Sequence, residues 1–164
     1  YIWHIGPETL EEVIISHAKE KKFKIGFAES CTGGMCANRI TSVSGSSAVF
    51  WGSIVSYANE VKSNVLGVKS ETLLNHGAVS LKTAQEMAFG AREKLGVDIA
   101  VATTGIAGPT GGSPDKPVGT VAIGIATKEG AKSELFHFKG NRETLKFRFS
   151  QAALFLLLDE ISRI

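Results

Sequence analysis

The stretch AESCTGG at residues 28–34 follows a short apolar run of Phe23, Ile25 and Phe27, and a helix-like segment comes after it. This order predicts a β-strand, a turn and an α-helix in succession, the unit from which α/β folds are built. Ser30 stands at the turn, where the first N–H groups of a helix have no intrahelical partner and can stabilise negative charge. Ser30 is therefore a candidate nucleophile, and the alternative is an ordinary helix N-cap.

Segments of strand and helix character alternate along the rest of the chain. Strands are expected at residues 24–29, 48–57, 98–103, 119–126 and 134–138, and helices at residues 7–21, 31–42, 59–66, 70–76, 80–95 and 141–163. The last two strands follow one another without a helix between them, which suits an antiparallel pair. We therefore expect an α/β protein, a three-layer α/β/α sandwich with a central mixed β-sheet.

Composition and charge exclude several classes of protein. A chain of 164 residues with 43% hydrophobic content suits a single globular domain over residues 1–164. The 18 basic and 16 acidic residues are interspersed, so no basic stripe for a nucleic acid is present. Cys31, Cys36 and the four scattered histidines have no zinc spacing, and we expect neither a metal nor a cofactor.

The apolar runs bear on the cellular location of the protein, and the first residue bears on whether the chain is part of a longer one. The longest apolar run, residues 152–158, is too short to span a membrane, and no signal peptide is visible. We therefore expect a cytoplasmic protein without a membrane partner. The chain begins at Tyr1 rather than at methionine, which favours a domain cut from a longer chain with an upstream domain. The sequence leaves open whether the protein is a homo-oligomer.

A second dense motif, GIAGPTGGSP at residues 105–114, comes after the strand predicted at residues 98–103. Ligands of open α/β sheets collect beyond the carboxyl ends of strands, and a glycine-rich loop there can cradle a phosphate with its N–H groups. Neither GxGxxG nor GxxxxGK[ST] is present, so the Rossmann and P-loop interpretations fail on spacing. The alternative is a long glycine- and proline-rich surface turn.

A serine nucleophile needs a base, and no histidine lies in either dense motif. No G-x-S-x-G elbow surrounds Ser30, so a Ser-His-Asp arrangement has little support. Lys62 and Tyr57 would lie near the same sheet end as Ser30 if the strands that precede them are neighbours. A lysine acts as a base only when burial or nearby positive charge lowers its pKa from about 10.4 toward neutrality. The alternative is an ordinary solvated lysine on a helix.

Cys31 and Arg142 also stand at positions that invite chemistry. A helix N-terminus could acidify the Cys31 thiol, but no histidine is placed to pair with it, so we rank it below Ser30. Arg142 opens the last predicted helix, where positive charge is disfavoured, and therefore needs another reason to be there. Binding an anionic substrate is one such reason, and a salt bridge to Glu143 or Asp159 is the alternative.

Six motifs stand in a fixed order along the chain. They are AESCTGG (28–34), GSSAVF (45–50), YANEVK (57–62), HGAVS (76–80), TTGIAGPTGG with KPVGTV (103–112 and 116–121) and GNRE (140–143). With this combination over residues 8–158, the chain resembles the C-terminal domain family of the competence/damage-inducible protein CinA, which includes nicotinamide mononucleotide deamidases. The resemblance implies a metal-independent amidohydrolase that converts nicotinamide mononucleotide to nicotinate mononucleotide and ammonia in pyridine nucleotide recycling.

The resemblance also implies roles for individual residues. The catalytic residues it implies are Ser30, Lys62 and Tyr57, acting on a pyridine mononucleotide as the small-molecule partner. The substrate-binding residues it implies are Thr32, Gly33, Gly34, Asn59, Thr104, Gly105, Gly108, Gly111 and Arg142. The sequence departs from the family pattern at Ser53, where a glycine is common, and at Lys146, where an arginine is frequent.

These residues suggest a mechanism in which neutral Lys62 takes the proton of Ser30, and Ser30 attacks the carboxamide carbon. The N–H groups of the turn at residues 31–34 would hold the developing oxyanion. Two other functions stay open. One is a non-catalytic nucleotide-binding or interaction module of a larger CinA-type protein. The other is a phosphoryl-transfer enzyme, which would want metal-binding carboxylates, although Asp115, directly after the glycine-rich motif, is the only acidic residue of that loop.

Overall fold

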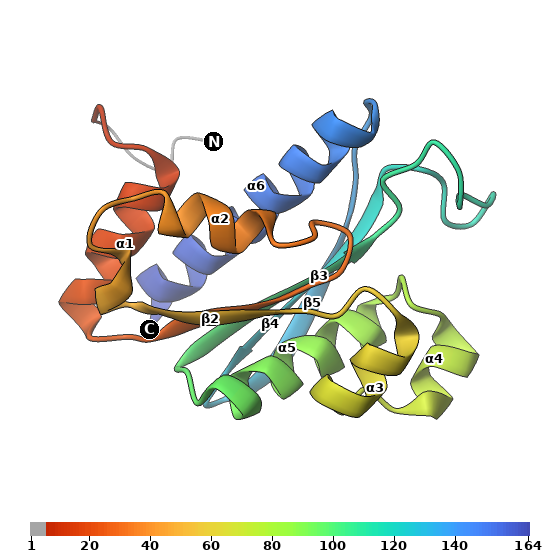
Figure 1. Ribbon diagram of the computed structural model, residues 1–164, viewed down its shortest axis with the longest axis horizontal. Helices are drawn as coiled ribbons and strands as arrows, with labels where there is room; N and C mark the ends of the chain where they lie inside the picture. Colours follow the sequence, from red (N-terminus) through yellow and green to blue (C-terminus); the bar gives the residue numbers. More distant parts are fainter. Residues whose placement is uncertain (1–5) are drawn as a thin grey trace.

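A five-stranded β-sheet divides the molecule into two layers of helices in the computed structural model, which describes residues 6–164 (Figure 1). The strands are β1 (Ile25–Glu29), β2 (Phe50–Val55), β3 (Ile99–Gly105), β4 (Thr120–Thr127) and β5 (Gly130–His137). Their order across the sheet is β2-β1-β3-β4-β5. β1 pairs in parallel with β2 and β3, whereas β4 is antiparallel to β3 and to β5. The expected mixed sheet is confirmed.

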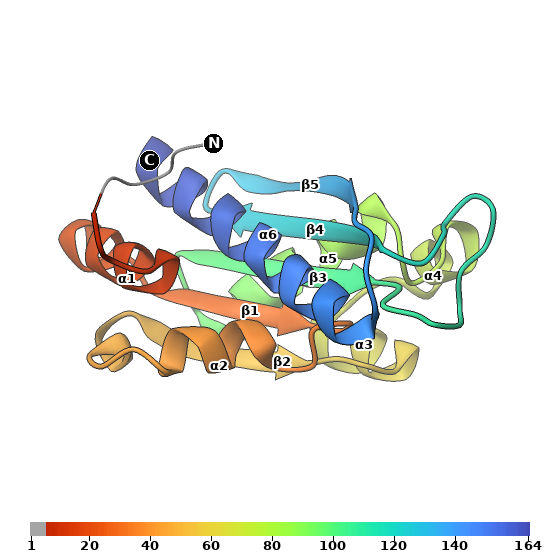
Figure 2. The same cartoon turned by 90° about the horizontal axis from the view of Figure 1, so that it is seen from above.

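Helices cover both faces of this sheet (Figure 2). They are α1 (Leu10–Lys21), α2 (Met35–Thr41), the 3-10 helix η1 (Ser46–Ala48), α3 (Asn59–Leu66), α4 (Ser70–His76), α5 (Leu81–Leu95) and α6 (Arg142–Arg163). α1, α2 and α6 lie on one face, and α3, α4 and α5 lie on the other (Figure 1). The expected three-layer α/β/α sandwich is therefore confirmed. Over residues 6–164, every helix is too short or too polar to cross a bilayer.

Two helices begin later than their predicted starts at residues 7 and 31. α1 begins at Leu10 because Thr9 is its N-cap: the Thr9 hydroxyl accepts a hydrogen bond from the Glu12 N–H, and the Glu12 carboxylate accepts one from the Thr9 N–H. α2 begins at Met35, because residues 31–34 form turns rather than helix. The capping side chain of Thr9 thus sets the start of α1, and the turns at residues 31–34 set the start of α2.

β5 begins at Gly130, four residues before the strand predicted at residues 134–138. Its first residues have low intrinsic β-propensity, but they continue the antiparallel pairing with β4 to the pair Thr127↔Gly130. Cross-strand pairing therefore overrides local propensity here. The antiparallel pair expected for the last two strands is confirmed.

Side chains of the central strands alternate between two apolar cores. Ile25 and Phe27 of β1 join the core beneath α1 and α6, whereas Ala28 joins the core beneath α5. The α5 side is packed closely because backbone atoms approach one another there. A Cβ atom added at Gly90 of α5 would lie 1.8 Å from the carbonyl oxygen of Leu66, the last residue of α3. This contact sets how closely α3 can approach α5.

Arg39 of α2 ties together the helices of the other layer. Its guanidinium donates hydrogen bonds to Glu11 of α1 (2.5 Å) and to Ser150 (2.9 Å) and Gln151 (2.6 Å) of α6. The same guanidinium lies 4.8 Å from the ring centroid of Phe147, which adds a cation–π contact. α2 is therefore anchored on the side of the helix layer as well as at its first turn.

Replacing Gly90 by alanine is expected to destabilise the fold, although alanine is the better helix former. Overpacking against a backbone carbonyl costs about 1–3 kcal/mol or more, whereas the helix-propensity gain is only about 1 kcal/mol. We expect urea denaturation of Gly90→Ala to give a free energy of unfolding about 2 kcal/mol below that of the unsubstituted protein. Gly96→Ala is the comparison for backbone strain without a clash: Gly96 has a positive φ of 63° but nothing within 4 Å of an added Cβ, so this variant should lose only about 1 kcal/mol. Unchanged stability of Gly90→Ala would contradict the tight contact between α3 and α5.

Candidate active site

A cavity of about 320 Å³ opens where the parallel strands β1, β2 and β3 end. Its walls come from the segments that follow these strands and from the start of α6. The lining residues are Ser30, Cys31, Tyr57, Asn59, Lys62, Ala78, Val79, Thr104, Gly105, Ile106, Ala107, Gly108, Thr110, Gly111 and Arg142. The expectation that the strands before Ser30 and before Lys62 are neighbours is confirmed by the pairing of β1 with β2.

Ser30 and Lys62 meet at the bottom of this cavity. Ser30 follows β1 directly, and its N–H donates to the Thr103 carbonyl of β3 (2.9 Å), which extends the sheet by one bond. The Lys62 Nζ lies 3.1 Å from the Ser30 Oγ and donates to the carbonyl oxygens of Ser56 (2.9 Å) and Tyr57 (2.8 Å). Two neutral carbonyls thus hold the lysine nitrogen against the serine hydroxyl.

The side chain of Lys62 is almost completely buried, with 1% of its surface exposed. Burial lowers the pKa of Lys62 below its usual value of 10.5, and the weaker influences of Cys31 and Glu60 act in the opposite direction. No carboxylate within residues 6–164 lies within ion-pair distance of this nitrogen. The surroundings therefore favour the neutral amine, which is the form that can accept a proton.

The neighbouring thiol is placed and tuned differently. Cys31 also lines the cavity but is 93% buried, and burial raises its pKa to about 12. A thiol with that pKa is protonated near neutral pH, whereas the reactive form of cysteine is the thiolate. Burial therefore disfavours the reactive form of Cys31, and the choice of Ser30 as the nucleophile stays a prediction.

The turn that follows Ser30 is organised around the carboxylate of Glu29, the last residue of β1. Glu29 is fully buried. Its carboxylate accepts five hydrogen bonds, from the hydroxyls of Thr32 (2.7 Å) and Ser53 (3.1 Å) and from the N–H groups of Gly34 (3.0 Å), Cys36 (3.0 Å) and Ala37 (2.9 Å). Sequence reasoning missed this residue, although an acidic residue at the end of an apolar strand is a signal that something must satisfy its charge.

These bonds change which N–H groups of the turn can face a substrate. The N–H of Gly34 donates to Glu29, and the N–H of Gly33 donates to the Ser30 carbonyl (3.1 Å). The expectation that the whole turn at residues 31–34 holds an oxyanion is therefore corrected. The candidate donors that remain in the turn are the N–H groups of Cys31 and Thr32.

Six of the nine predicted substrate-binding residues line the cavity: Asn59, Thr104, Gly105, Gly108, Gly111 and Arg142. The other three, Thr32, Gly33 and Gly34, do not. The Thr32 hydroxyl is turned away from the cavity, toward Glu29 and Thr103. Ala78 and Val79 line the cavity without having been predicted to do so, although the HGAVS motif that contains them had been noticed. The Ala78 carbonyl accepts a hydrogen bond from the Thr104 hydroxyl (2.7 Å).

Arg142 lies across the rim of the cavity. Its Nη1 donates to the Gly108 carbonyl (2.8 Å), and its Nη2 donates to the hydroxyl of Tyr57 (3.3 Å). The predicted alternative, a salt bridge to Glu143 or Asp159, is not found in the described part of the chain, and Asp159 pairs with Arg163 instead (2.6 Å). Both partners of Arg142 are neutral, so its positive charge remains available to an anion.

Tyr57 contributes two different groups to the site. Its carbonyl oxygen accepts a hydrogen bond from Lys62, whereas its ring is 63% exposed and stands at the cavity rim beside Arg142. The phenol oxygen is therefore bonded to an arginine rather than to the Ser30–Lys62 pair. The predicted catalytic role of Tyr57 has its clearest structural basis in the main-chain contact.

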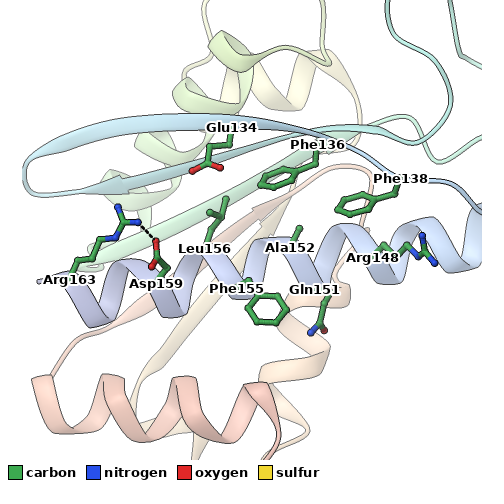
Figure 3. Close-up of a pocket in the computed structure, with 10 residues that line it drawn as sticks. All are labelled: Glu134, Phe136, Phe138, Arg148, Gln151, Ala152, Phe155, Leu156, Asp159 and Arg163. Carbon is green, nitrogen blue, oxygen red and sulfur yellow. Dashed lines mark ion pairs between the residues drawn. The ribbon is translucent and has the colours of Figure 1, made fainter. Parts of the chain in front are cut away.

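A larger cavity of about 620 Å³ lies between β5 and α6 (Figure 3). Its walls are formed largely by Phe136, Phe138, Phe155 and Leu156, and charged side chains stand around them. The lining includes no serine, threonine, cysteine or lysine, so it offers no activated nucleophile. Residues 6–164 also contain no group of three or more histidine, cysteine or acidic side chains that could hold a metal ion. The smaller cavity is the candidate active site.

Comparison with known proteins gives a consistent result. Residues 7–161 match the family model of the CinA C-terminal domain. A CinA-like protein of Chloroherpeton thalassium is 52% identical over 161 residues, which cover 96% of this chain and 38% of that protein. A CinA-like protein of Chlorobium limicola is 50% identical over 159 residues, covering 94% of this chain and 37% of that protein. The chain thus spans well under half the length of these relatives.

Solved structures match over nearly their whole length. The competence/damage inducible protein CihA from Agrobacterium tumefaciens is 37% identical, with a TM-score of 0.88 over 95% of this chain and 98% of that chain. A CinA superfamily protein from Klebsiella pneumoniae is 31% identical, with a TM-score of 0.88 over 96% of this chain and 100% of that chain. The same arrangement of strands and helices therefore occurs in chains of about this size.

The buried lysine should make stability depend on pH in a defined direction. Because the pKa of Lys62 is lower in the folded state, the unfolded chain binds more protons between that pKa and 10.5, and the free energy of unfolding rises with pH over this window. Lys62→Met removes the titrating group. We expect urea denaturation between about pH 6 and about pH 10 to show this rise in the unsubstituted protein but not in Lys62→Met. Lys128→Met, at an exposed position, is the control that should keep the rise, and a rise of equal size in Lys62→Met would contradict the lowered pKa.

Proposed function

The chain belongs to the CinA C-terminal domain family, and we propose that it is an amidohydrolase that deamidates nicotinamide mononucleotide. The observation that carries this proposal is the 3.1 Å contact between the Ser30 Oγ and the Nζ of the buried Lys62, inside a cavity at the carboxyl ends of parallel strands. A serine activated by a neutral lysine suits acyl transfer from an amide. The products are nicotinate mononucleotide and ammonia.

The lysine is bonded in the manner that a general base requires. A neutral amine has two N–H groups and one lone pair. The carbonyls of Ser56 and Tyr57 can accept the two N–H groups, which leaves the lone pair directed at the hydroxyl of Ser30. Lys62 takes the Ser30 proton while the Ser30 oxygen forms a bond to the carboxamide carbon. The oxyanion of the tetrahedral intermediate then accepts a hydrogen bond from the N–H of Cys31, the residue after the nucleophile, which lines the cavity.

The same lysine completes both halves of the reaction. The ammonium form of Lys62 returns its proton to the leaving nitrogen as the C–N bond breaks, which releases ammonia and leaves an ester on Ser30. A water molecule then gives a proton to Lys62 and attacks the ester carbon. Breaking the bond to the Ser30 oxygen frees the carboxylate and restores the hydroxyl. One amide and one water are consumed for each acid and each ammonia formed.

The rim of the cavity suits the two charged parts of the nucleotide. Arg142 presents a planar cation held only by neutral partners, and the glycine-rich loop at residues 105–112 adds main-chain N–H groups, so together they can bind the 5′-phosphate. The exposed ring of Tyr57 offers an aromatic face to the positively charged pyridinium ring. The charges of this substrate and the groups at the rim are therefore complementary.

A non-catalytic nucleotide-binding module of a longer protein is the second candidate function. It is favoured by the fact that the chain spans only 38% of the length of a relative such as the one from Chloroherpeton thalassium. This alternative predicts binding of the nucleotide without turnover. An assay of ammonia release therefore separates it from the amidohydrolase.

We expect the purified domain to release ammonia from nicotinamide mononucleotide, and Ser30→Ala and Lys62→Ala each to lower kcat by about 10⁴-fold or more. The double variant should be hardly slower than either single variant, because the two residues act as a unit. Lys128→Ala, at an exposed position, should keep the original rate. Losses that multiply in the double variant would contradict the shared role, and binding without ammonia release would favour the non-catalytic module.

Arg142→Ala should erase most of the preference for nicotinamide mononucleotide over nicotinamide riboside. Charge-assisted hydrogen bonds to a phosphate contribute about 1.5–3 kcal/mol each, so kcat/KM for the nucleotide should fall by about ten- to one-hundred-fold while the riboside changes much less. The matched control is Arg148→Ala on the same helix, since Arg148 lines the larger cavity and not this one. An equal loss for both substrates would place Arg142 at the carboxamide or in the structural framework.

A further inference from the structure

Glu29 is a buried charge next to the nucleophile. It ends β1, precedes Ser30 and has no exposed surface. A carboxylate in such a place is costly unless hydrogen-bond donors surround it. Within residues 6–164 no lysine, arginine or histidine nitrogen lies within ion-pair distance of it. Its negative charge is therefore stabilised by hydrogen bonds and by the positive end of a helix.

The first turn of α2 supplies most of those donors. The residue at the N-cap position of α2 is Gly34, which has no side chain with which to cap the helix. The first N–H groups of a helix lack intrahelical acceptors. Glu29 takes three N–H groups at this end of α2, those of Gly34, Cys36 and Ala37, so it replaces the missing cap from the preceding strand. Its two oxygens thereby fix the course of the turn between Ser30 and α2.

The same residue also contacts the segment that holds the lysine. The Glu29 carbonyl accepts a hydrogen bond from the N–H of Ser56 (2.9 Å), and its carboxylate accepts one from the hydroxyl of Ser53 on β2. The Ser56 carbonyl is in turn an acceptor for the Nζ of Lys62. Glu29 is thus bonded both to the turn after the nucleophile and to the strand end that holds the base.

We propose that Glu29 is the positioning residue of the Ser30–Lys62 pair. Its carboxylate fixes the turn that carries Ser30 and links it to β2, so that the Ser30 oxygen stays within reach of the Lys62 nitrogen. Glu29 does not line the cavity, so it acts through the pair rather than on the substrate. This inference rests on the proposed function, in which Ser30 is the nucleophile and Lys62 is its base. A displacement of about 1 Å between reacting groups costs about 100-fold in rate.

The test replaces Glu29 by glutamine, which has the same shape but puts an NH₂ group where N–H and O–H donors now converge. Two measurements are made on each variant. One is the rate at which a small sulfonyl fluoride modifies Ser30, followed by mass spectrometry, and the other is kcat and KM for ammonia release from nicotinamide mononucleotide. We expect Glu29→Gln to lower both the labelling rate and kcat by about 100-fold while KM changes by less than about three-fold.

The matched control is Arg39→Met, which loosens the same helix α2 from the side facing α1 and α6 and leaves the Glu29 bonds in place. It should lower Tm at least as much as Glu29→Gln but keep the labelling rate within about two-fold. Thr32→Val is the second variant, because it preserves shape and removes the shortest donor to Glu29 together with the contact of the same hydroxyl to Thr103. It should slow labelling by about ten-fold even if Glu29→Gln does not fold.

The outcomes separate this inference from the proposed substrate. Slow labelling of Glu29→Gln and Thr32→Val supports the positioning role. This holds even if neither the variants nor the unsubstituted protein release ammonia from the nucleotide. That pattern would contradict the proposed substrate alone. Unchanged labelling in Thr32→Val or in folded Glu29→Gln would overturn the inference, as would labelling rates in Arg39→Met and Glu29→Gln that fall in proportion to Tm. Absence of labelling at Ser30 in the unsubstituted protein would overturn both.

Discussion

A carboxylate without exposed surface has to be given donors, and this requirement shapes the end of the sheet that carries the site. Three of the five hydrogen-bond donors to Glu29 come from the first turn of α2, which these bonds hold against the end of β1. A fourth donor comes from β2. The N-terminus of α2, which could otherwise have bound an external anion, is therefore neutralised from within the protein. In the proposed function the groups that bind the phosphate therefore come from elsewhere, from Arg142 and the glycine-rich loop.

The buried Lys62 has hydrogen-bond partners of the opposite kind. Its nitrogen is also enclosed, but its hydrogen-bond partners are two neutral carbonyls and a hydroxyl, and burial lowers its pKa more than Cys31 and Glu60 raise it. Glu29 and Lys62 thus have distinct surroundings, one rich in hydrogen-bond donors and one rich in neutral acceptors. In the proposed mechanism, this difference lets Glu29 support the framework while Lys62 accepts and returns protons.

The sequence allowed much of this to be predicted. The alternation of strands and helices, with no helix between the last two strands, led to the mixed sheet. The turn after the strand before Ser30 and the strand before Lys62 led to the approach of these two residues, because parallel neighbours end at the same edge. The start of α2 and the hydrogen-bond partners of its first N–H groups could not be predicted in this way. They depend on Glu29 reaching residues up to eight positions later and Ser53 on another strand, contacts that no local pattern encodes. The early start of β5 likewise depends on its pairing with β4.

The parallel and antiparallel halves of the mixed sheet are placed differently relative to the cavity. The parallel half ends at the cavity, whereas the turn between β4 and β5 lies at the opposite end, since β4 runs antiparallel to β3 and begins where β3 ends (Figure 2). Neither β1 nor β2 connects that turn to Ser30, so a change in the sequence of the turn is not transmitted to Ser30 along these strands. The turn is a natural place for evolution to insert extra segments, and for an experimenter to attach a fluorophore or surface tether without obstructing the cavity mouth.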